Sequence, residues 1–400
     1  MNVEQLVRDT FHEISCDAPP PPPGLADRVL HIRRRRRIRT FAAVAGATAA
    51  VIIAAVAVPV LGLTDRADGR PASVTGTPDV IGHPDQSPPR DLIAAGGTAV
   101  SAYWTSKWVL QSGSGSKATR TLQRTWHLYN TATGRYDTAP WAYLDVAPGM
   151  RTAAVLEGPL PSKRVGLLDT ATGKVTRWID LDHPAGGVSW SPKGDLLAVT
   201  TYSKTPETMI GTLEVNQFVQ SRTGYYIVDP GSGTKTYHEL PQDTSMGGNM
   251  REDMKWSRDG SLLKVTNATL SDALFYDLQG HQQPAPKGEE SGYPYAGLSP
   301  DGRYLAGDFA GNGSAVATEV LDAKTGKRVA TQPVQELIAW ADNDRLIAWG
   351  CDPKKCDGRS EFANQLLLVD VSGEHVTPLS GFRKASATYG GRWTPLFTAR

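Results

Sequence analysis

The sequence has almost no excess of charge of either sign and very little cysteine. Its 400 residues include 42 Lys and Arg against 41 Asp and Glu, with only 3 cysteines. The balanced charge argues against a basic nucleic-acid-binding protein, and a hydrophobic content of 40% argues against a wholly disordered chain. We therefore expect a folded protein without a nucleic-acid partner.

Catalytic and metal-binding motifs are also absent from the sequence. It has no Gly-x-Ser-x-Gly elbow, no phosphate-binding P-loop and no dinucleotide fingerprint. Its 8 histidines lack the pair spacing of a zinc site. We expect a protein that is not an enzyme and that binds no cofactor or metal.

Glycine and proline are abundant, with 40 and 28 copies, which predicts many turns and few long helices. The exception is residues 41–63, which carry no charge. A helix of this length reaches about 34 Å, whereas the hydrocarbon core of a bilayer is about 30 Å thick. The sequence predicts a single transmembrane helix over residues 41–63.

Basic residues are concentrated immediately before this apolar segment. They are Arg33, Arg34, Arg35, Arg36, Arg37 and Arg39. The positive-inside rule places residues 1–40 in the cytoplasm and the chain after the membrane segment outside the cell. A nucleic-acid or nuclear-targeting patch is the alternative. Because the arginines stand directly before the apolar segment in the sequence, a membrane-flanking role is favoured.

A cleaved signal peptide is the alternative to an uncleaved signal anchor. Ala55-Val56-Ala57 has the small-x-small pattern that a signal peptidase accepts. The apolar segment is longer than that of most signal peptides and begins only after residue 40, so an anchor fits better. No cysteine follows the segment directly, which excludes a lipoprotein anchor there.

The cytoplasmic segment begins with a predicted amphipathic helix and a rigid spacer. Five consecutive prolines, 19–23, form the spacer and end any preceding helix. Apolar residues recur before it at helical intervals: Val3, Leu6, Val7, Phe11 and Ile14. So short a helix cannot form its own core, and we expect it to bind a cytoplasmic protein or the membrane surface.

Part of this helix resembles a zinc-binding motif. His12 and Cys16 match the first half of the His-x3-Cys-x2-Cys motif of zinc-containing anti-sigma factors, but Pro19 stands where the second cysteine belongs. Two ligands do not complete a structural zinc site, so we expect no metal there. Residues 64–90, rich in proline and glycine, are predicted to be a linker outside the membrane.

Residues 91–400 contain an internal repeat built on two alternating patterns. The first is a tight turn between two apolar runs, in residues 188–199, 254–265 and 297–306, with weaker copies at 146–150 and 339–346. The second is a strand that ends in Asp or Asn, followed shortly by glycine: Gly134, Gly173, Gly233, Gly280, Gly326 and Gly373. Each repeat therefore supplies two hairpins, or four strands.

Repeats of this length predict an all-β fold of the β-propeller type. One four-stranded sheet would expose two apolar faces, which are buried when successive sheets pack around an axis. The apolar run from Leu196 to Val199 suits a strand covered on both faces. We interpret the Asp-Gly pairs as turn residues and Trp190, Trp256 and Trp340 as packing between sheets.

The pattern Trp190-Ser191-Pro192-Lys193-Gly194, followed by Leu196 to Ala198, resembles the TolB-like, WD-type propeller repeats of bacterial envelope proteins. This resemblance covers about residues 92–379 and implies a binding platform more than any one activity. The whole layout, with its short cytoplasmic segment, arginine run and membrane span, resembles that of actinobacterial membrane proteins.

Six blades are expected, the first beginning near Leu92 with a turn at Gly96-Gly97. The tail around Trp393 either closes this first blade or starts a seventh; closure is favoured because few residues follow. Extra length lies around residues 202–223, followed by a polar stretch at 242–253. This insertion is either a binding element or a longer surface hairpin.

Two cysteines fall outside the cell in this topology. Cys351 and Cys356 flank a short turn, and we predict a structural disulfide between them, with a metal site as the weaker alternative.

Three functional hypotheses follow from the sequence. The first is a membrane-anchored extracytoplasmic propeller that binds or senses a protein, peptide or envelope ligand without catalysis. The second is a transmembrane regulator whose N-terminal helix holds a cytoplasmic partner such as a sigma factor. The third is a hydrolase that uses carboxylates in the propeller funnel.

Overall fold

The computed structural model describes residues 79–211, 216–219, 221–241, 251, 253–266, 273–290, 296–310, 317–351, 364–383 and 392–400. The chain divides into two compact units, Met1–Ala72 and Ser73–Arg400, and all described residues belong to the second. The predicted N-terminal helix, arginine cluster, membrane segment 41–63 and the first part of the linker lie outside the description. Among the residues described, none forms a helix with the length and apolarity that a bilayer crossing requires.

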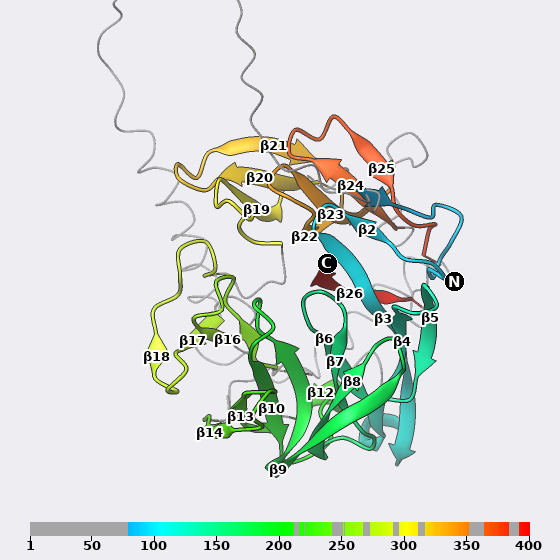
Figure 1. Ribbon diagram of the computed structural model, residues 1–400, viewed down its shortest axis with the longest axis vertical. Coiled ribbons are helices and arrows are strands. Elements are labelled where there is room, and N and C mark those ends of the chain that lie inside the picture. Colours follow the sequence, from blue (N-terminus) through cyan, green and yellow to red (C-terminus); the bar gives the residue numbers. More distant parts are fainter. Residues whose placement is uncertain are drawn as a thin grey trace, which may run out of the picture. The chain divides into compact units, whose positions relative to one another are not determined.

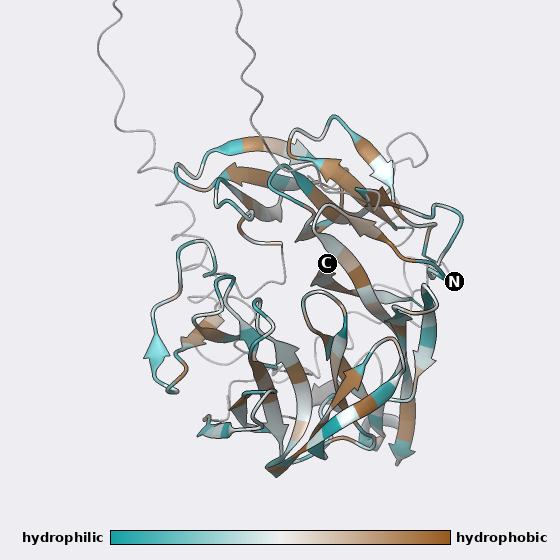
Figure 2. Cartoon of the chain, in the orientation of Figure 1, coloured by the Kyte–Doolittle hydropathy of each residue, from teal (hydrophilic) through white to brown (hydrophobic). Residues whose placement is uncertain are grey.

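The all-β prediction is confirmed for the described residues, whose one helical element is the 3-10 turn η1 (Gly115–Lys117). The strands form five sheets, and all pairs of named strands are antiparallel. In Figure 1 the sheets follow one another in chain order around the molecule, with β26 toward the middle of the view. Figure 2 shows the apolar residues along the strands and hydrophilic residues at the hairpin tips.

The first sheet joins both ends of the described chain. Its eight strands are β1 (Val80–Ile81), β2 (Ala94–Ala95), β3 (Thr98–Ser112), β4 (Thr119–Asn130), β5 (Arg135–Ala139), β11 (Thr208–Gly211), β12 (Asn216–Phe218) and the C-terminal β26 (Thr394–Ala399). β26 pairs with one edge of β3, with Thr394 opposite Trp104 and Ala399 opposite Thr98. The prediction that the tail closes the first sheet is therefore confirmed.

The predicted linker, 64–90, contributes its last residues to this compact unit. β1 pairs with β2, and the indole nitrogen of Trp393 donates to Ser87 Oγ at 3.0 Å. The compact structure therefore begins before residue 91.

The second sheet has seven strands because one long strand, β9, pairs with two neighbouring groups of strands, β6–β8 on one side and β10, β13 and β14 on the other. Its strands are β6 (Tyr143–Val146), β7 (Thr152–Leu156), β8 (Ser162–Asp169), β9 (Lys174–Trp190), β10 (Leu197–Tyr202), β13 (Arg222–Val228) and β14 (Lys235–Glu239). The first half of β9 pairs with β8, and its last residues, from Ala185 to Trp190, pair with β10.

Three smaller sheets complete the chain order. They are β15 (Lys255–Trp256), β16 (Leu263–Thr266), β17 (Ala273–Tyr276) and β18 (Gln282–Gln283); β19 (Tyr304–Phe309), β20 (Thr318–Asp322) and β21 (Arg328–Gln332); and β22 (Glu336–Trp340), β23 (Arg345–Gly350), β24 (Gln365–Asp370) and β25 (Val376–Pro378). An isolated bridge between Leu298 and Leu305 adds one residue pair beside β19.

Hydrogen bonds join successive strand groups and return to the first. They are Thr398 Oγ1 to Val146 O (3.3 Å), Trp256 Nε1 to Ser189 O (3.0 Å), the Arg258 guanidinium to Pro300 O, Trp340 Nε1 to Gly297 O (3.0 Å) and Thr98 Oγ1 to Trp340 O (2.7 Å). Because the last sheet contacts the first, the groups form a closed ring, which is the arrangement of a β-propeller.

The turn and packing predictions are also confirmed. The six repeat glycines all have positive φ, as do Gly194, Gly260 and Gly302 in the tight turns. Trp190, Trp256 and Trp340 are buried, with 8%, 7% and 8% exposure, and Leu197 to Val199 are wholly buried. Apolar clusters fill the interfaces between neighbouring groups, since each contains residues from two of them.

Candidate functional site

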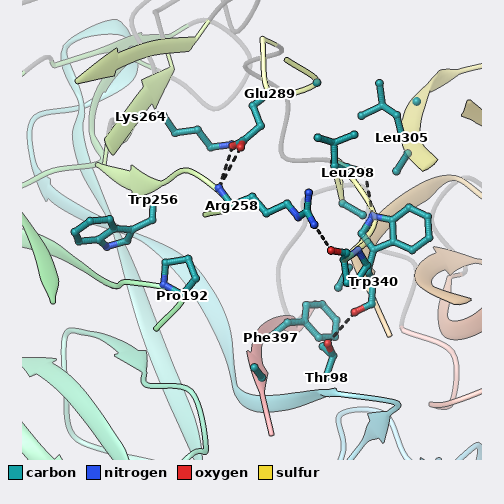
Figure 3. A pocket seen from close by; sticks show the side chains of 18 of the residues that line it. Thr98, Pro192, Trp256, Arg258, Lys264, Glu289, Leu298, Leu305, Trp340 and Phe397 are labelled. Carbon is teal, nitrogen blue, oxygen red and sulfur yellow. Dashed lines mark hydrogen bonds and ion pairs between the residues drawn. The ribbon is translucent and has the colours of Figure 1, made fainter. Parts of the chain in front are cut away.

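A cavity of about 840 Å³ lies between the sheet β15–β18 and the sheet β19–β21. None of the apolar clusters formed by described residues spans this interface. Figure 3 shows apolar side chains on its walls, among them Trp256, Leu298 and Phe397. Among the described residues, the space at this interface is thus lined by apolar side chains that do not pack into one cluster.

The charges in this cavity are paired with one another. Glu289 accepts from the backbone nitrogen of Arg258 at 3.1 Å and contacts Lys264 Nζ at 3.3 Å. The Arg258 guanidinium donates to the carbonyl of Pro300 (Figure 3). The bond from Arg258 to Pro300 joins the two sheets, and the Glu289 contacts hold the first of them together, so these charged residues have a structural role.

A second group of polar residues lies at the opposite end of the ring. In each strand group, the tight turn that follows the innermost strand lies at the end of the ring that contains the cavity. Tyr143, Lys255 and Thr394 lie at the other end, where the innermost strands β6, β15 and β26 begin. The innermost strands of successive propeller sheets run in the same direction, so their N-terminal ends all lie at one end of the ring. We call this end of the ring the mouth.

Two buried arginines and two buried carboxylates form the centre of the mouth, and with Tyr143 we call them the mouth cluster: Arg124, Tyr143, Glu207, Arg251 and Asp253. Arg124 makes two hydrogen bonds to Glu207, and their side chains are 8% and 5% exposed. Arg251 lies 3.7 Å from Glu207 and 3.0 Å from Asp253. Buried charges of opposite sign fix each other's positions because an unpaired one would lose its hydration uncompensated.

Aromatic rings complete the mouth cluster. The guanidinium carbon of Arg124 lies 4.5 Å from the ring centre of Trp104, and that of Arg251 lies 4.1 Å from the ring centre of Tyr143. The Tyr202 hydroxyl donates to Asp253 at 2.8 Å. Both arginines are thus held by a carboxylate and an aromatic face, an arrangement typical of binding surfaces.

The insertion after β10 supplies one member of this cluster. β11 (Thr208–Gly211) and β12 (Asn216–Phe218) follow it, and β11 pairs with β4 of the first sheet, not with its own group. Glu207, directly before β11, has a φ of 60°, which is rare for a residue with a side chain. The insertion therefore crosses to the first sheet and places Glu207 beside Arg124.

The backbone near β9 leaves space for the cluster. A Cβ atom on Gly187 would lie 2.2 Å from the carboxylate of Asp253, so a larger residue would displace that carboxylate. The sequence pattern did not single out Gly187. Its neighbour Gly186 in an otherwise extended segment was the available signal.

The pKa values of two aspartates in the mouth, Asp145 and Asp253, are shifted in opposite directions. Burial raises the pKa of Asp145, although Lys255 and the backbone nitrogen of Trp190 act in the opposite direction. Burial also opposes ionisation of Asp253, but Arg251, Lys255 and the hydroxyl of Tyr202 outweigh it and leave its pKa below the ordinary value. The backbone N–H of Trp190 donates a hydrogen bond of 2.6 Å to the carboxylate of Asp145.

The site residues predicted from the sequence are not part of this mouth cluster. Cys351 is disulfide-bonded, and Cys356 lies outside the described residues, so their pairing stays a prediction. The arginine cluster 33–39 and the helix residues Val3 to Ile14 also lie outside the description. Within the described part of the chain, no group of three or more His, Cys, Asp or Glu residues is arranged to hold a metal ion.

Comparison with known proteins gives likenesses of fold only. No family model and no curated protein matches the chain. Among solved structures, it is similar to TolB from Acinetobacter baumannii, with 17% identity and a TM-score of 0.39, over 77% of this chain and 68% of that chain. At such values the similarity carries no argument, and the fold assignment rests on strand pairing.

Two other solved structures share this limited similarity. A chain of Kuenenia stuttgartiensis hydrazine synthase is 15% identical with a TM-score of 0.33, over 62% of this chain and 70% of that chain. A chain of the mitotic checkpoint complex is 14% identical with a TM-score of 0.36, over 83% of this chain and 87% of that chain.

Proposed function

We propose that the ring is a non-catalytic binding platform whose mouth recognises a protein, peptide or envelope ligand. The observation that carries this proposal is the mouth cluster, in which strands from separate sheets bring paired charges and aromatic rings together at one end of the ring. The buried ion pairs hold the partly exposed rings of Trp104 and Tyr143 in place, and rigid aromatic side chains of this kind suit recognition.

The carboxylates of the mouth are already paired or hydrogen-bonded within the protein, which supports a binding function more than hydrolysis. Glu207 and Asp253 are neutralised by arginines, and Asp145 accepts a backbone hydrogen bond. A general base or nucleophile requires a free lone pair within reach of the substrate. We therefore propose that the protein is not an enzyme.

We further propose that the ring has six four-stranded blades. The sharing of β9 between two groups supports counting the seven-stranded sheet as two blades. The pairing of β26 with β3 supports a first blade made from both ends of the unit, as in propellers closed by strand exchange.

Residues 41–63 and the preceding arginines support a membrane anchor, with the ring outside the cell and the N-terminal helix in the cytoplasm. In this proposal the platform faces the cell envelope, where its ligand is found, and an N-terminal partner adds regulation.

Site-specific photo-crosslinking in intact cells tests the binding function. A photoreactive phenylalanine analogue replaces Ser106, which is half-buried beside Trp104, or in a matched control Val329, which is 47% exposed on the outer strand β21. We expect a discrete crosslinked product from position 106 and none from position 329. Equal products from both positions, or a product from position 329 alone, would contradict the proposal.

A further inference from the structure

A second pocket, of about 530 Å³, adjoins the mouth cluster. Trp104, whose ring carries the Arg124 guanidinium, forms part of its wall. The paired strands β22 and β23 contribute Glu336 and Trp349. Arg383, which follows β25, and Arg392, which precedes β26, complete the charged lining. The pocket therefore combines aromatic walls with two cations and one carboxylate.

Arg383 is the most deeply buried cation of this pocket. Only 9% of the residue is exposed, and its guanidinium carbon lies 3.5 Å from the ring centre of Trp349. Nη1 donates to the Trp393 carbonyl at 3.3 Å, whereas the buried Nε has no hydrogen-bond partner among the described residues. A guanidinium fixed by stacking thus retains an unused donor.

The charge of Arg383 is also poorly balanced. Burial and the neighbouring Arg392 lower its pKa to about 9, and the attraction of Glu336 does not offset them. No carboxylate among the described residues forms a salt bridge with Arg383. Burying a cation without a paired anion is unfavourable because hydration is lost, and a bound anion would offset that loss.

Glu336 limits which anion fits. Its carboxyl is half-buried, and burial raises its pKa although both arginines oppose the shift. Arg383 forms no salt bridge with a carboxylate among the described residues, so its guanidinium offers one positive charge to a ligand. A monoanion balances this charge, whereas a phosphate dianion would be repelled by Glu336.

We propose that this pocket is a carboxylate-binding subsite of the mouth, in which Arg383 holds the carboxylate and the Trp104 and Trp349 faces hold its apolar stem. The fork of a guanidinium matches a carboxylate, and the pocket volume suits one amino-acid residue. The inference rests on the proposed binding function and names the chemistry of the ligand: the C-terminal carboxylate of a peptide, or an acidic group on an apolar stem.

A matched pair of small probes tests this subsite. Full-length protein in detergent is titrated calorimetrically with N-acetylphenylalanine and with its amide, N-acetylphenylalaninamide. We expect saturable binding of the acid and about tenfold or greater weakening for the amide, because a charge-assisted bond is lost. Inorganic phosphate is expected to bind more weakly than the acid.

Two substitutions with opposite expected effects on affinity are used, because misfolding of a variant could weaken binding but could not strengthen it. Arg383→Met should abolish binding of the acid, whereas Glu336→Gln should tighten it several-fold by removing a competing negative charge. Arg164→Met is the matched control, because Arg164 also stacks on a tryptophan, Trp178 at 4.1 Å, but is paired with Glu157 outside the pocket.

The outcomes separate this inference from the proposed function. Equal affinity for acid and amide, absence of binding to both, or weaker binding by Glu336→Gln would overturn the carboxylate subsite. Stronger binding of phosphate, lost in Arg383→Met, would show an anion site of another kind and also overturn it. The photo-crosslinking result from position 106 tests the platform independently of these probes.

Discussion

Glu207 is the residue on which the mouth cluster depends most. It neutralises Arg124 directly and lies 3.7 Å from Arg251, and all three side chains are at most 11% exposed. Loss of its charge would leave two buried cations with one remaining carboxylate, Asp253. Such an imbalance is costly because the protein interior hydrates a charge poorly.

We expect Glu207→Gln to lower the free energy of unfolding by about 3 kcal/mol, since one partner of a buried ion pair is removed. Urea denaturation followed by tryptophan fluorescence measures this change. Glu157→Gln is the control, because the Glu157–Arg164 pair is about 40% exposed and solvent screening should make its loss much less destabilising than that of Glu207. Equal effects of the two substitutions would contradict the importance of the buried pair.

Arg251→Met is expected to shift acid unfolding to higher pH. Asp253 has a folded-state pKa below its ordinary value, so its contribution to stability is present above the unfolded pKa of about 3.9 and is lost as pH falls through the folded pKa. Without Arg251, burial dominates and the pKa of Asp253 rises. The acid-unfolding midpoint, measured by fluorescence, should therefore rise.

The control for this pH measurement is Arg328→Met, which removes an arginine that is 57% exposed on β21 and pairs with Glu319. Its midpoint should match that of the unmodified protein. A midpoint for Arg251→Met that stays constant or falls would refute the assigned electrostatic role.

At the scale of elements, two strands contact groups that are distant in sequence. β26 completes the first sheet from the C-terminal end, and β11 crosses from the insertion to β4. β26 also binds the next group through Thr398 and Val146. Closing the ring thus depends on a short strand whose pairing partner is almost 300 residues earlier.

Removal of residues 394–400 is expected to abolish the cooperative unfolding transition, because β3 and the adjacent apolar cluster lose their cover. A synthetic peptide of residues 392–400 added in trans should restore the transition, and a scrambled peptide should not. Circular dichroism during heating provides the measurement. A truncated protein that unfolds as cooperatively as the full chain would exclude closure by β26.

At the scale of the whole molecule, the proposed topology separates the ring from the N-terminal segment. In this proposal, the uncharged segment 41–63 and the arginines on one flank orient the chain by the positive-inside rule. The orientation also assigns Cys351 to an oxidising compartment, in agreement with its disulfide.

Proteinase added to intact cells is expected to digest the ring and to spare a fragment that contains residues 1–40, detected with an N-terminal epitope tag. Permeabilised cells serve as the control, in which the tag should be lost as well. A ring protected in intact cells, but digested after permeabilisation, would reverse the orientation.

A pull-down with residues 1–40 distinguishes a regulator from a simple anchor. The regulatory hypothesis expects one specific cytoplasmic protein, and its recovery should be lost when Leu6 and Phe11 are replaced by Asp, because the apolar face is then interrupted. Recovery that does not change with these substitutions would argue against binding by this face.

The sequence by itself determined the repeat, the all-β fold, the turn glycines and the buried tryptophans, because each depends on neighbours within one hairpin or one repeat. Gly194, Gly260 and Gly302 have the positive φ that their tight turns require, and Trp256 and Trp340 donate hydrogen bonds to the neighbouring group. Such local rules recur in every copy, so comparison of the copies reveals them.

Only the tertiary structure decided where the proposed binding surface lies. Arg124, Glu207 and Arg251 come from three separate segments, and their pairing depends on β11 crossing to β4 instead of staying in its own group. Arg383 likewise reaches Trp349 from the segment that follows β25, and its Nη1 donates to the carbonyl of Trp393, which directly precedes β26. Each residue occurs once and outside the repeat, so no periodicity marks it, and its role arises from long-range packing that a local pattern does not encode.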